Sequence, residues 1–249
     1  MKSLNKKFPD FLRTNPLLRD IRFRIEKFSE INESPHKSLV KKLERYPDLA
    51  IFDVGANLGQ FGIDMRRNGF SGKIFSFEPI LQTYLNLVKT TQKYRDWKPF
   101  QLGMGSSDGV QSINVSGNAG LSSSILPMLE IHKRNFPKSV TNSRELIRMS
   151  TVDHQLQLLK IEASNILLKI DVQGYESEVL KGANTSLRVI PACFLEVSLQ
   201  PLYEGELTIL PILNMLADSG HHIVDVFRGV KSKKGELLQL DIVTELSDK

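Results

Sequence analysis

The residues best suited to chemistry in this chain surround a glycine-rich turn, Gly55-Ala56-Asn57-Leu58-Gly59. Asp53 precedes the turn, and Glu78 ends the apolar run that follows roughly 20 residues later. Glycines allow the backbone to approach a ligand closely, and the first turn of a following helix presents free N–H groups. An acid at the end of the next strand can accept hydrogen bonds from a ribose. The pattern therefore predicts a site for a nucleoside-containing cofactor, formed by Asp53, Gly55, Asn57, Gly59 and Glu78.

The spacing within the turn limits which cofactor can bind there. The glycines are spaced GxxxG and not GxGxxG, and no Lys-Ser or Lys-Thr follows them, so a P-loop is excluded. Asp53 would repel a pyrophosphate, but it suits a ligand that carries an ammonium or sulfonium group. S-adenosylmethionine carries both groups and also a ribose for Glu78. Two alternatives stay open: Asp53 caps the turn, or the chain is a nicotinamide-dependent oxidoreductase on a similar sheet.

The strands that position these residues are predicted from apolar runs at 51–54, 73–77, 166–170 and 192–197. Helical patterns between the runs predict an α/β protein with a doubly wound, mostly parallel sheet. In such a sheet a ligand lies outside the carboxyl ends of the strands, where the strand order reverses. Asp53, Glu78, Asp171 and Glu196 all lie at or near these ends, so they should converge on one rim although they are far apart in the sequence.

Two of these acids are candidates for the chemical step. A hydroxyl that accepts a methyl group has to lose its proton, so a nearby general base would help. Asp171 and Glu196 are the candidate bases, with Glu176 behind them, although Glu176 also fits an acid that stabilises a helix N-terminus. Together with Asp153, the first two acids could offer oxygen ligands to a divalent ion. No known metal-binding spacing is present, and we predict no metal ligand.

The segment 104–150 shows the least regular pattern. It contains several glycines and serines, a predicted short strand at 110–115 and a second strand that begins near 146. A long segment of weak pattern inside a compact domain is often a binding loop or lid. We therefore expect the acceptor to enter over 121–136.

The ends of the chain carry clearer signals. Asn15-Pro16 and Ser34-Pro35 are helix starts, and each is followed by apolar residues at helical spacing. Two amphipathic helices should therefore precede the first strand, which divides the chain into a helical extension (1–46) and one catalytic domain (47–249). Two final runs, 222–227 and 240–244, predict an antiparallel pair at the sheet edge.

Composition limits the class of protein. The chain is 41% hydrophobic and 24% charged, and its single cysteine excludes an internal disulfide. No apolar run has the length of a transmembrane helix, and the N-terminus has no apolar secretory core, so a cytoplasmic location is expected.

The net charge of +5 is unevenly distributed along the chain. Residues 1–46 carry 12 Lys and Arg against 6 Asp and Glu, and the remainder carries 21 against 22. This excess fits either a solvated helix face or a surface for an anionic partner, and the N-terminal helices could also support a homo-oligomer. Nucleic acid is not expected as a partner, because the body has no basic stripe with interleaved aromatic residues.

Three segments together resemble the FkbM-type family of S-adenosylmethionine-dependent methyltransferases. They are FDVGANLGQF followed by FEP, then LLKIDVQGYESEVLKGA, and then LEVSLQPLYEG. The resemblance implies a Rossmann-like class I methyltransferase fold, with a mostly parallel seven-stranded sheet and an antiparallel edge strand. It also implies O-methylation of a hydroxyl on a small-molecule or glycan acceptor, such as a carbohydrate or secondary metabolite. A non-catalytic protein that retains the cofactor pocket as a scaffold is the remaining alternative.

The resemblance also implies roles for individual residues. Asp53, Gly55, Asn57 and Gly59 would hold the methionine end of the cofactor, and Glu78 would bind the ribose hydroxyls. A third strand is predicted at 99–103, and Ser107 and Asp108 follow it, where methyltransferases of this fold contact adenine. Asp108-Gly109 fits a simple turn equally well.

Overall fold

The computed structural model describes residues 34–46, 48–118 and 120–247. The helix predicted after Asn15-Pro16 lies outside these residues. The helix predicted after Ser34-Pro35 forms α3 (Pro35–Leu43), with proline at its first position. The side chains of Leu39 and Leu43 are buried against the body of the protein, so this part of the predicted extension packs on the catalytic domain.

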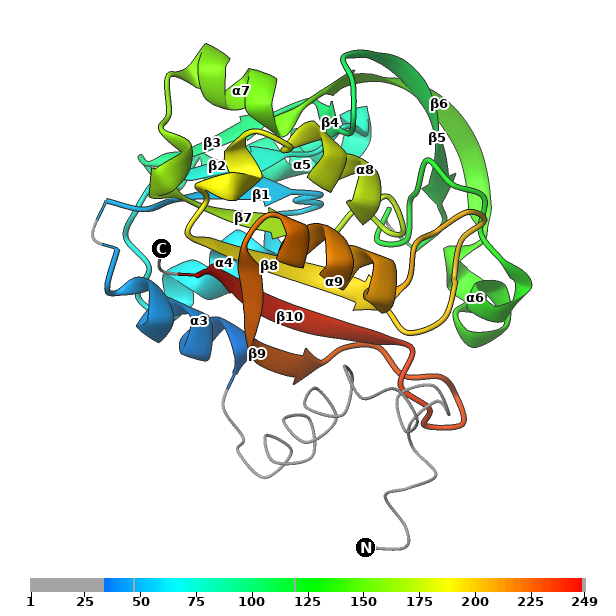
Figure 1. Cartoon of the computed structure of the whole chain (residues 1–249). Helices are drawn as coiled ribbons and strands as arrows, with labels where there is room; N and C mark the ends of the chain where they lie inside the picture. Colours follow the sequence, from blue (N-terminus) through cyan, green and yellow to red (C-terminus); the bar gives the residue numbers. More distant parts are fainter. Residues whose placement is uncertain (1–33, 47, 119, 248–249) are drawn as a thin grey trace, which may run out of the picture.

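In the described part of the chain, seven strands form the main sheet in the order β3-β2-β1-β7-β8-β10-β9 (Figure 1). The strands are β1 (Ala50–Val54), β2 (Ile74–Phe77), β3 (Trp97–Phe100), β7 (Ile166–Ile170), β8 (Ala192–Ser198), β9 (His221–Arg228) and β10 (Gln239–Leu246). β10 pairs antiparallel with both β8 and β9, and the other pairs in this sheet are parallel. The predicted mostly parallel sheet is confirmed, with the antiparallel strand one position inside the edge strand β9.

Helices cover both faces of this sheet, which explains why the strands are apolar on both sides. One face carries α3, α4 (Gln60–Arg67) and α5 (Leu81–Thr91), and the other carries α7 (Val152–Leu159), α8 (Glu176–Gly182) and α9 (Ile209–Asp218) (Figure 1). Alternate residues of β1 point to opposite faces. Ile51 packs with α3 and α4 in one core cluster, while Phe52 packs with α7, α8 and α9 in the other.

The strand order reverses between β1 and β7, which are parallel neighbours in the sheet. The chain leaves both strands through tight turns that touch each other. Gly55 has φ +74°, and a Cβ atom built on it would lie 1.8 Å from the backbone oxygen of Asp171. Only glycine lets the two turns approach this closely, so its place in the predicted turn has a packing reason.

A second, smaller sheet covers the rim of the first and was not predicted. It consists of β4 (Gly103–Met104), β5 (Gly109–Ser116) and β6 (Thr141–Ser150), in the order β4-β6-β5. The sequence predicts β5 well but only the last residues of β6. The reason is that the first half of β6 is exposed and polar, so it lacks the alternation by which a half-buried strand is recognised. Short helix α6 (Glu130–Asn135) lies in the connection between β5 and β6.

The contact between the two turns can be tested with a matched pair of glycine variants. Gly205 has φ +76°, almost the same as Gly55, but a Cβ atom there would meet nothing within 4 Å. Gly205→Ala should therefore cost about 1–2 kcal/mol of unfolding free energy, from backbone conformation alone. Gly55→Ala should cost about 1–3 kcal/mol more, because it also overpacks the turn. Urea unfolding measures both, and equal losses would show that the contact is unimportant.

Candidate active site

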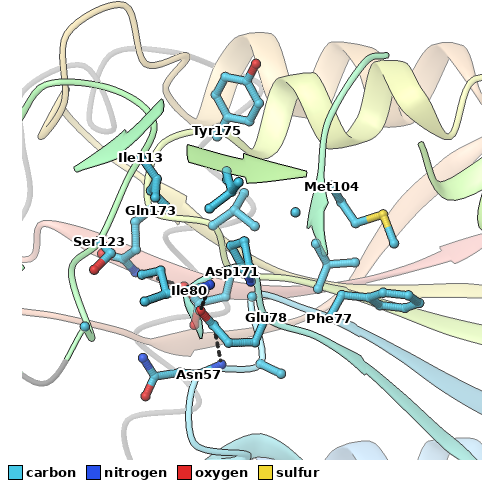
Figure 2. A pocket seen from close by; sticks show the side chains of 18 of the residues that line it. Asn57, Phe77, Glu78, Ile80, Met104, Ile113, Ser123, Asp171, Gln173 and Tyr175 are labelled. Atoms are coloured by element: carbon cyan, nitrogen blue, oxygen red, sulfur yellow. Dashed lines mark hydrogen bonds between the residues drawn. The ribbon is translucent and has the colours of Figure 1, made fainter. Parts of the chain in front are cut away.

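A cavity of about 270 Å³ lies at the carboxyl ends of β1, β2 and β7, beneath the second sheet. This is the switch point of the main sheet, where a doubly wound fold binds its ligand. Figure 2 shows Phe77 and Met104 at one end of the cavity, and Ser123 and Gln173 toward the other. The lining comes from four parts of the chain: 54–61, 77–80 with 102–104, 113–125 with 147–149, and 169–175.

Glu78 lies in the cavity wall with its side chain almost fully buried. Its Oε2 accepts a hydrogen bond from the backbone N–H of Asn57 at 3.0 Å, and its Oε1 accepts one from Ile80 at 3.0 Å (Figure 2). Burial nevertheless raises the pKa of Glu78 to about 7. The carboxylate therefore ties the turn after β1 to the turn after β2, and each of its oxygens keeps acceptor capacity for a ligand hydroxyl.

The predicted glycine-rich turn is present, but its members do different things. Gly55 and Asn57 line the cavity, and Asn57 adopts φ +48°, which asparagine tolerates better than most residues. Gly59 is not part of the lining. It is the left-handed N-cap of α4, packed so closely that a Cβ atom there would lie 3.0 Å from Leu87. Gly59 therefore has a packing role, and its contact with the cofactor stays a prediction.

Asp53 forms an ion pair inside the protein. Its side chain is fully buried, does not line the cavity and lies 3.0 Å from the ammonium group of Lys169, its register partner on β7. Ser76 donates a hydrogen bond to its other oxygen at 2.8 Å. The positive charge that the sequence analysis assigned to a ligand is supplied by the protein itself. The sequence alone does not reveal this pair, because Lys169 lies more than a hundred residues further along the chain. A contact of Asp53 with the cofactor stays a prediction.

Lys169 was not among the residues predicted for the site, and it connects β7 to β1 at the switch point. Its ammonium group donates hydrogen bonds to the backbone oxygens of Val54 at 3.2 Å and Gly55 at 2.8 Å. Burial alone would lower the pKa of Lys169, but the attraction of Asp53 and Asp171 outweighs it and raises the pKa. The lysine therefore stays charged, and β1 and β7 are joined at the point where the cavity opens.

Asp171 and Glu196 come together as predicted, through a residue that was not predicted. The side-chain amide of Gln173 donates to Asp171 Oδ1 at 2.8 Å and to Glu196 Oε2 at 3.1 Å. Asp171 lines the cavity and is 37% exposed, whereas Glu196 lies behind Gln173 and outside the lining. Burial raises the pKa of Glu196 well above its ordinary value, and the charges of Asp171 and Asp241 raise it further. Of the two acids, only Asp171 can touch a molecule in the cavity.

Glu176 holds the backbone rather than the ligand. It is buried, lies outside the cavity lining, and its Oε1 accepts hydrogen bonds from the backbone N–H groups of Val172 at 3.1 Å and Gly174 at 3.2 Å. Burial raises its pKa to about 8. In this structure Glu176 holds the loop that carries Gln173, and its candidate catalytic role stays a prediction.

Ser107 and Asp108 also lie outside the cavity. Both are exposed, and Asp108 forms an ion pair with His154 at 2.8 Å and accepts a hydrogen bond from Ser150 at 2.6 Å. These contacts, that of His154 first, lower the pKa of Asp108. β3 ends at Phe100, earlier than the predicted strand, and the contact of Ser107 and Asp108 with adenine stays a prediction.

The residues that follow β3 in the cavity wall are instead Leu102, Gly103 and Met104. Together with Phe77 they form an apolar surface next to Glu78. Such a pairing suits an aromatic base beside a ribose, so the residues fit an adenosine group.

Within the described ranges, no group of three or more His, Cys, Asp or Glu side chains is arranged to hold a metal ion. None of the helices in these ranges has the length and apolarity needed to cross a membrane.

The sheet order, the antiparallel strand beside the edge and the cavity at the switch point define a Rossmann-like class I methyltransferase. Residues 53–233, well over half of the chain, match the methyltransferase FkbM domain. The chain therefore belongs to the FkbM methyltransferase family. It is an enzyme that uses S-adenosylmethionine as its methyl donor.

Comparison with other proteins places the chain among named methyltransferases. The 2-O-methyltransferase NoeI of Sinorhizobium fredii is 26% identical over 219 residues, which are 80% of this chain and 86% of that protein. The hexuronic acid methyltransferase AglP of Haloferax volcanii is 26% identical over 155 residues, 62% of this chain and 58% of that protein. A solved magnesium protoporphyrin IX methyltransferase from Synechocystis aligns with 94% of this chain and 85% of its own, with 11% identity and a TM-score of 0.47.

The position of Glu78 predicts how cofactor binding depends on pH. Because its pKa is about 7, the carboxylate that can accept ribose hydroxyls forms mainly above neutral pH. The affinity for S-adenosylhomocysteine should rise between pH 6 and 8. Glu78→Gln should weaken binding about 10- to 100-fold at pH 8 and remove that pH dependence. Calorimetry tests both effects, with exposed Glu130→Gln as the control; unchanged affinity in Glu78→Gln would refute the ribose role.

The raised pKa of Glu176 predicts how the stability of the protein depends on pH. Its pKa rises from 4.5 to about 8 in the folded state, so between these values the folded protein holds a proton that the unfolded chain has lost. The free energy of unfolding should therefore fall as pH rises through this window. In Glu176→Gln this fall should be less steep than in the wild type. Urea unfolding from pH 5 to 8 measures the slope.

The control for this measurement is Glu178→Gln on the same helix. The pKa of Glu178 is lowered, in spite of burial, by hydrogen bonds from Lys181 and Ser106. Its titration therefore lies below this range, and its slope should match that of the wild type. Part of the slope should remain in Glu176→Gln, because the pKa values of Glu78, Glu196 and Asp241 are also raised. A slope equal to that of the wild type would contradict the assignment.

Proposed function

We propose that the enzyme transfers a methyl group to a hydroxyl on a carbohydrate or a related secondary metabolite, with Asp171 as the general base. The observation that carries this proposal is the Oδ2 oxygen of Asp171. Its Oδ1 is occupied by Gln173, whereas no described residue donates a hydrogen bond to Oδ2, which lies 3.9 Å from Lys169 Nζ. The carboxylate thus presents one acceptor atom to the cavity.

The chemistry follows from that geometry. Bound S-adenosylmethionine supplies an electrophilic methyl group on a sulfonium. The acceptor oxygen forms the new bond to the methyl carbon as the carbon–sulfur bond breaks, and the hydroxyl proton passes to Asp171 Oδ2. Holding the oxygen in line lowers much of the barrier by position alone, and a correctly placed base contributes further.

The cavity provides polar groups for a hydroxylated acceptor at the end away from Phe77 and Met104. Ser123, Gln173 and Asn57 contribute a hydroxyl and two amides to this lining (Figure 2). Polar groups that are fixed in a mostly apolar pocket set the orientation of a ligand. The name of NoeI, a 2-O-methyltransferase, supports methylation of an oxygen. The name of AglP, a hexuronic acid methyltransferase, supports an acceptor of the carbohydrate class.

The predicted contact of residues 1–46 with an anionic surface, and self-association through them, stay predictions. Within the described part of this segment, three polar contacts are directed at β9 and β10 of the protein's own sheet. Lys42 and Ser38 contact Asp225 on β9, and Arg45 pairs with Glu245 on β10. These contacts take up part of the segment's basic charge, so a surface contact would have to use the remainder.

The proposed role of Asp171 predicts a selective loss of turnover. Asp171→Asn should lower kcat about 10²- to 10⁴-fold, because the amide cannot take the proton, while the affinity for S-adenosylhomocysteine changes little. Exposed Asp218→Asn is the control. The assay is mass spectrometry for a methyl-sized gain across a panel of sugars, uronic acids, glycans and natural-product alcohols. Undiminished turnover in Asp171→Asn would show that Asp171 is not the base. If no compound on the panel is methylated by the wild type, the non-catalytic scaffold alternative is favoured.

A further inference from the structure

Gln173 occupies an unusual position in the loop after β7. Its φ is +56°, which few non-glycine residues adopt, and the next residue, Gly174, has φ +94°. Such backbone conformations persist only where the surroundings hold them in place, and they concentrate at functional sites. The side chain of Gln173 lines the cavity next to Asp171 (Figure 2).

Every polar group of the Gln173 side chain has a partner that suits it. The NH₂ group donates to Asp171 at 2.8 Å and to Glu196 at 3.1 Å, and Oε1 accepts from the Tyr203 hydroxyl at 3.0 Å. A carboxylate accepts only, so the NH₂ group has to face the two acids and the oxygen has to face the tyrosine. The network therefore determines how the amide is oriented.

The backbone around Gln173 is held just as firmly. Its carbonyl oxygen accepts a hydrogen bond from Ser124 at 2.7 Å, and a Cβ atom on Gly174 would lie 3.0 Å from the Tyr203 ring. The same Tyr203 hydroxyl lies 3.2 Å from the backbone oxygen of Ser122. The loop 120–125, which lines the cavity, is thereby joined to the residue that contacts Asp171.

We propose that Gln173 is a positioning residue that holds the Asp171 carboxylate with Oδ2 toward the acceptor hydroxyl and separates it from Glu196. The proposal rests on the proposed function, because it gives the orientation of the base a purpose. The amide satisfies Oδ1, which leaves Oδ2 as the atom for the proton. It also donates to both acids at once, so neither has to share a proton with the other.

The charges around Asp171 make this separation important. Several ionisable groups face the Asp171–Glu196 pair from the surrounding elements: Lys169 on β7, Glu176 on α8, Asp241 on β10, and Tyr203 and Glu206 in the segment after β8. Gln239 also donates a hydrogen bond to Glu196. Lys169 is the one cation in this group of described residues, and its nearest carboxylate is that of Asp53. A further acid at position 173 would raise the pKa of the cluster.

The decisive variant is Gln173→Glu, which keeps the shape of the side chain but replaces the donor with a carboxyl. The acid limb of the pH profile of kcat should move upward by about 1 pH unit or more. Turnover should therefore fall on the acid side of the profile and recover at higher pH, with unchanged affinity for S-adenosylhomocysteine. Gln157→Glu, on the exposed face of α7, adds the same charge away from the site and should leave the profile in place. A uniform loss of kcat with no shift of the limb would overturn the proposal.

A second variant tests the anchor of Gln173 without changing any charge. Tyr203→Phe removes the hydroxyl that holds Oε1 and should lower kcat about 2- to 10-fold, the range for one neutral hydrogen bond. The KM for S-adenosylmethionine should not change. A change in that KM with kcat preserved would show that the anchor serves cofactor binding and would count against the proposal.

A measurement that needs no acceptor separates this proposal from the proposed function. In protein with ¹³C-labelled aspartate, the Asp171 carboxyl signal is assigned by its absence in Asp171→Asn and is titrated by NMR. Its midpoint should lie higher in Gln173→Glu than in the wild type. If the wild type methylates nothing on the panel, the proposed function fails, and this midpoint still decides the role of Gln173. An unchanged midpoint overturns it.

Discussion

The structure of the site depends on one buried ion pair, between Asp53 on β1 and Lys169 on β7. The two residues are register partners at the point where the strand order reverses, and both are almost completely buried. A lone charge at this depth would be strongly destabilising, whereas a pair with further hydrogen bonds is tolerated. Lys169 also binds two backbone oxygens of the turn after β1, so the pair fixes the floor of the cavity.

The cavity is built outward from that floor by contacts between turns. Gly55 touches the backbone of Asp171, and Glu78 links the turns after β1 and β2 through two backbone N–H groups. Glu176 does the same for the loop after β7. Asp53, Glu176 and Glu196 thus lie outside the cavity lining, whereas Glu78 and Asp171 line it. Acidic side chains at strand ends indicate where the site is, but their burial and partners decide which of them can act.

The fold was largely predictable, because each of its elements carries a local signal. The apolar runs of β1, β2, β7 and β8, and the helix start at Ser34-Pro35, can be recognised without knowing their neighbours. The second sheet could not be predicted in full, since much of β6 lies in solvent and carries no apolar alternation. The same applies to Ser107 and Asp108: the short strand β4 places Met104 in the cavity and leaves those two residues outside it.

The sequence by itself determined the family, the cofactor class and the rim where the site lies. Those depend on short motifs, and the physical chemistry of a glycine turn or an acid at a strand end is contained in a few neighbouring residues. Only the tertiary structure decided what each acid does. Asp53 is neutralised by Lys169, Glu196 is screened by Gln173, and Asp171 alone of the three keeps an oxygen toward the cavity. The reason is that the charge and availability of a buried carboxylate depend on partners from distant segments, which meet only when the strands are side by side.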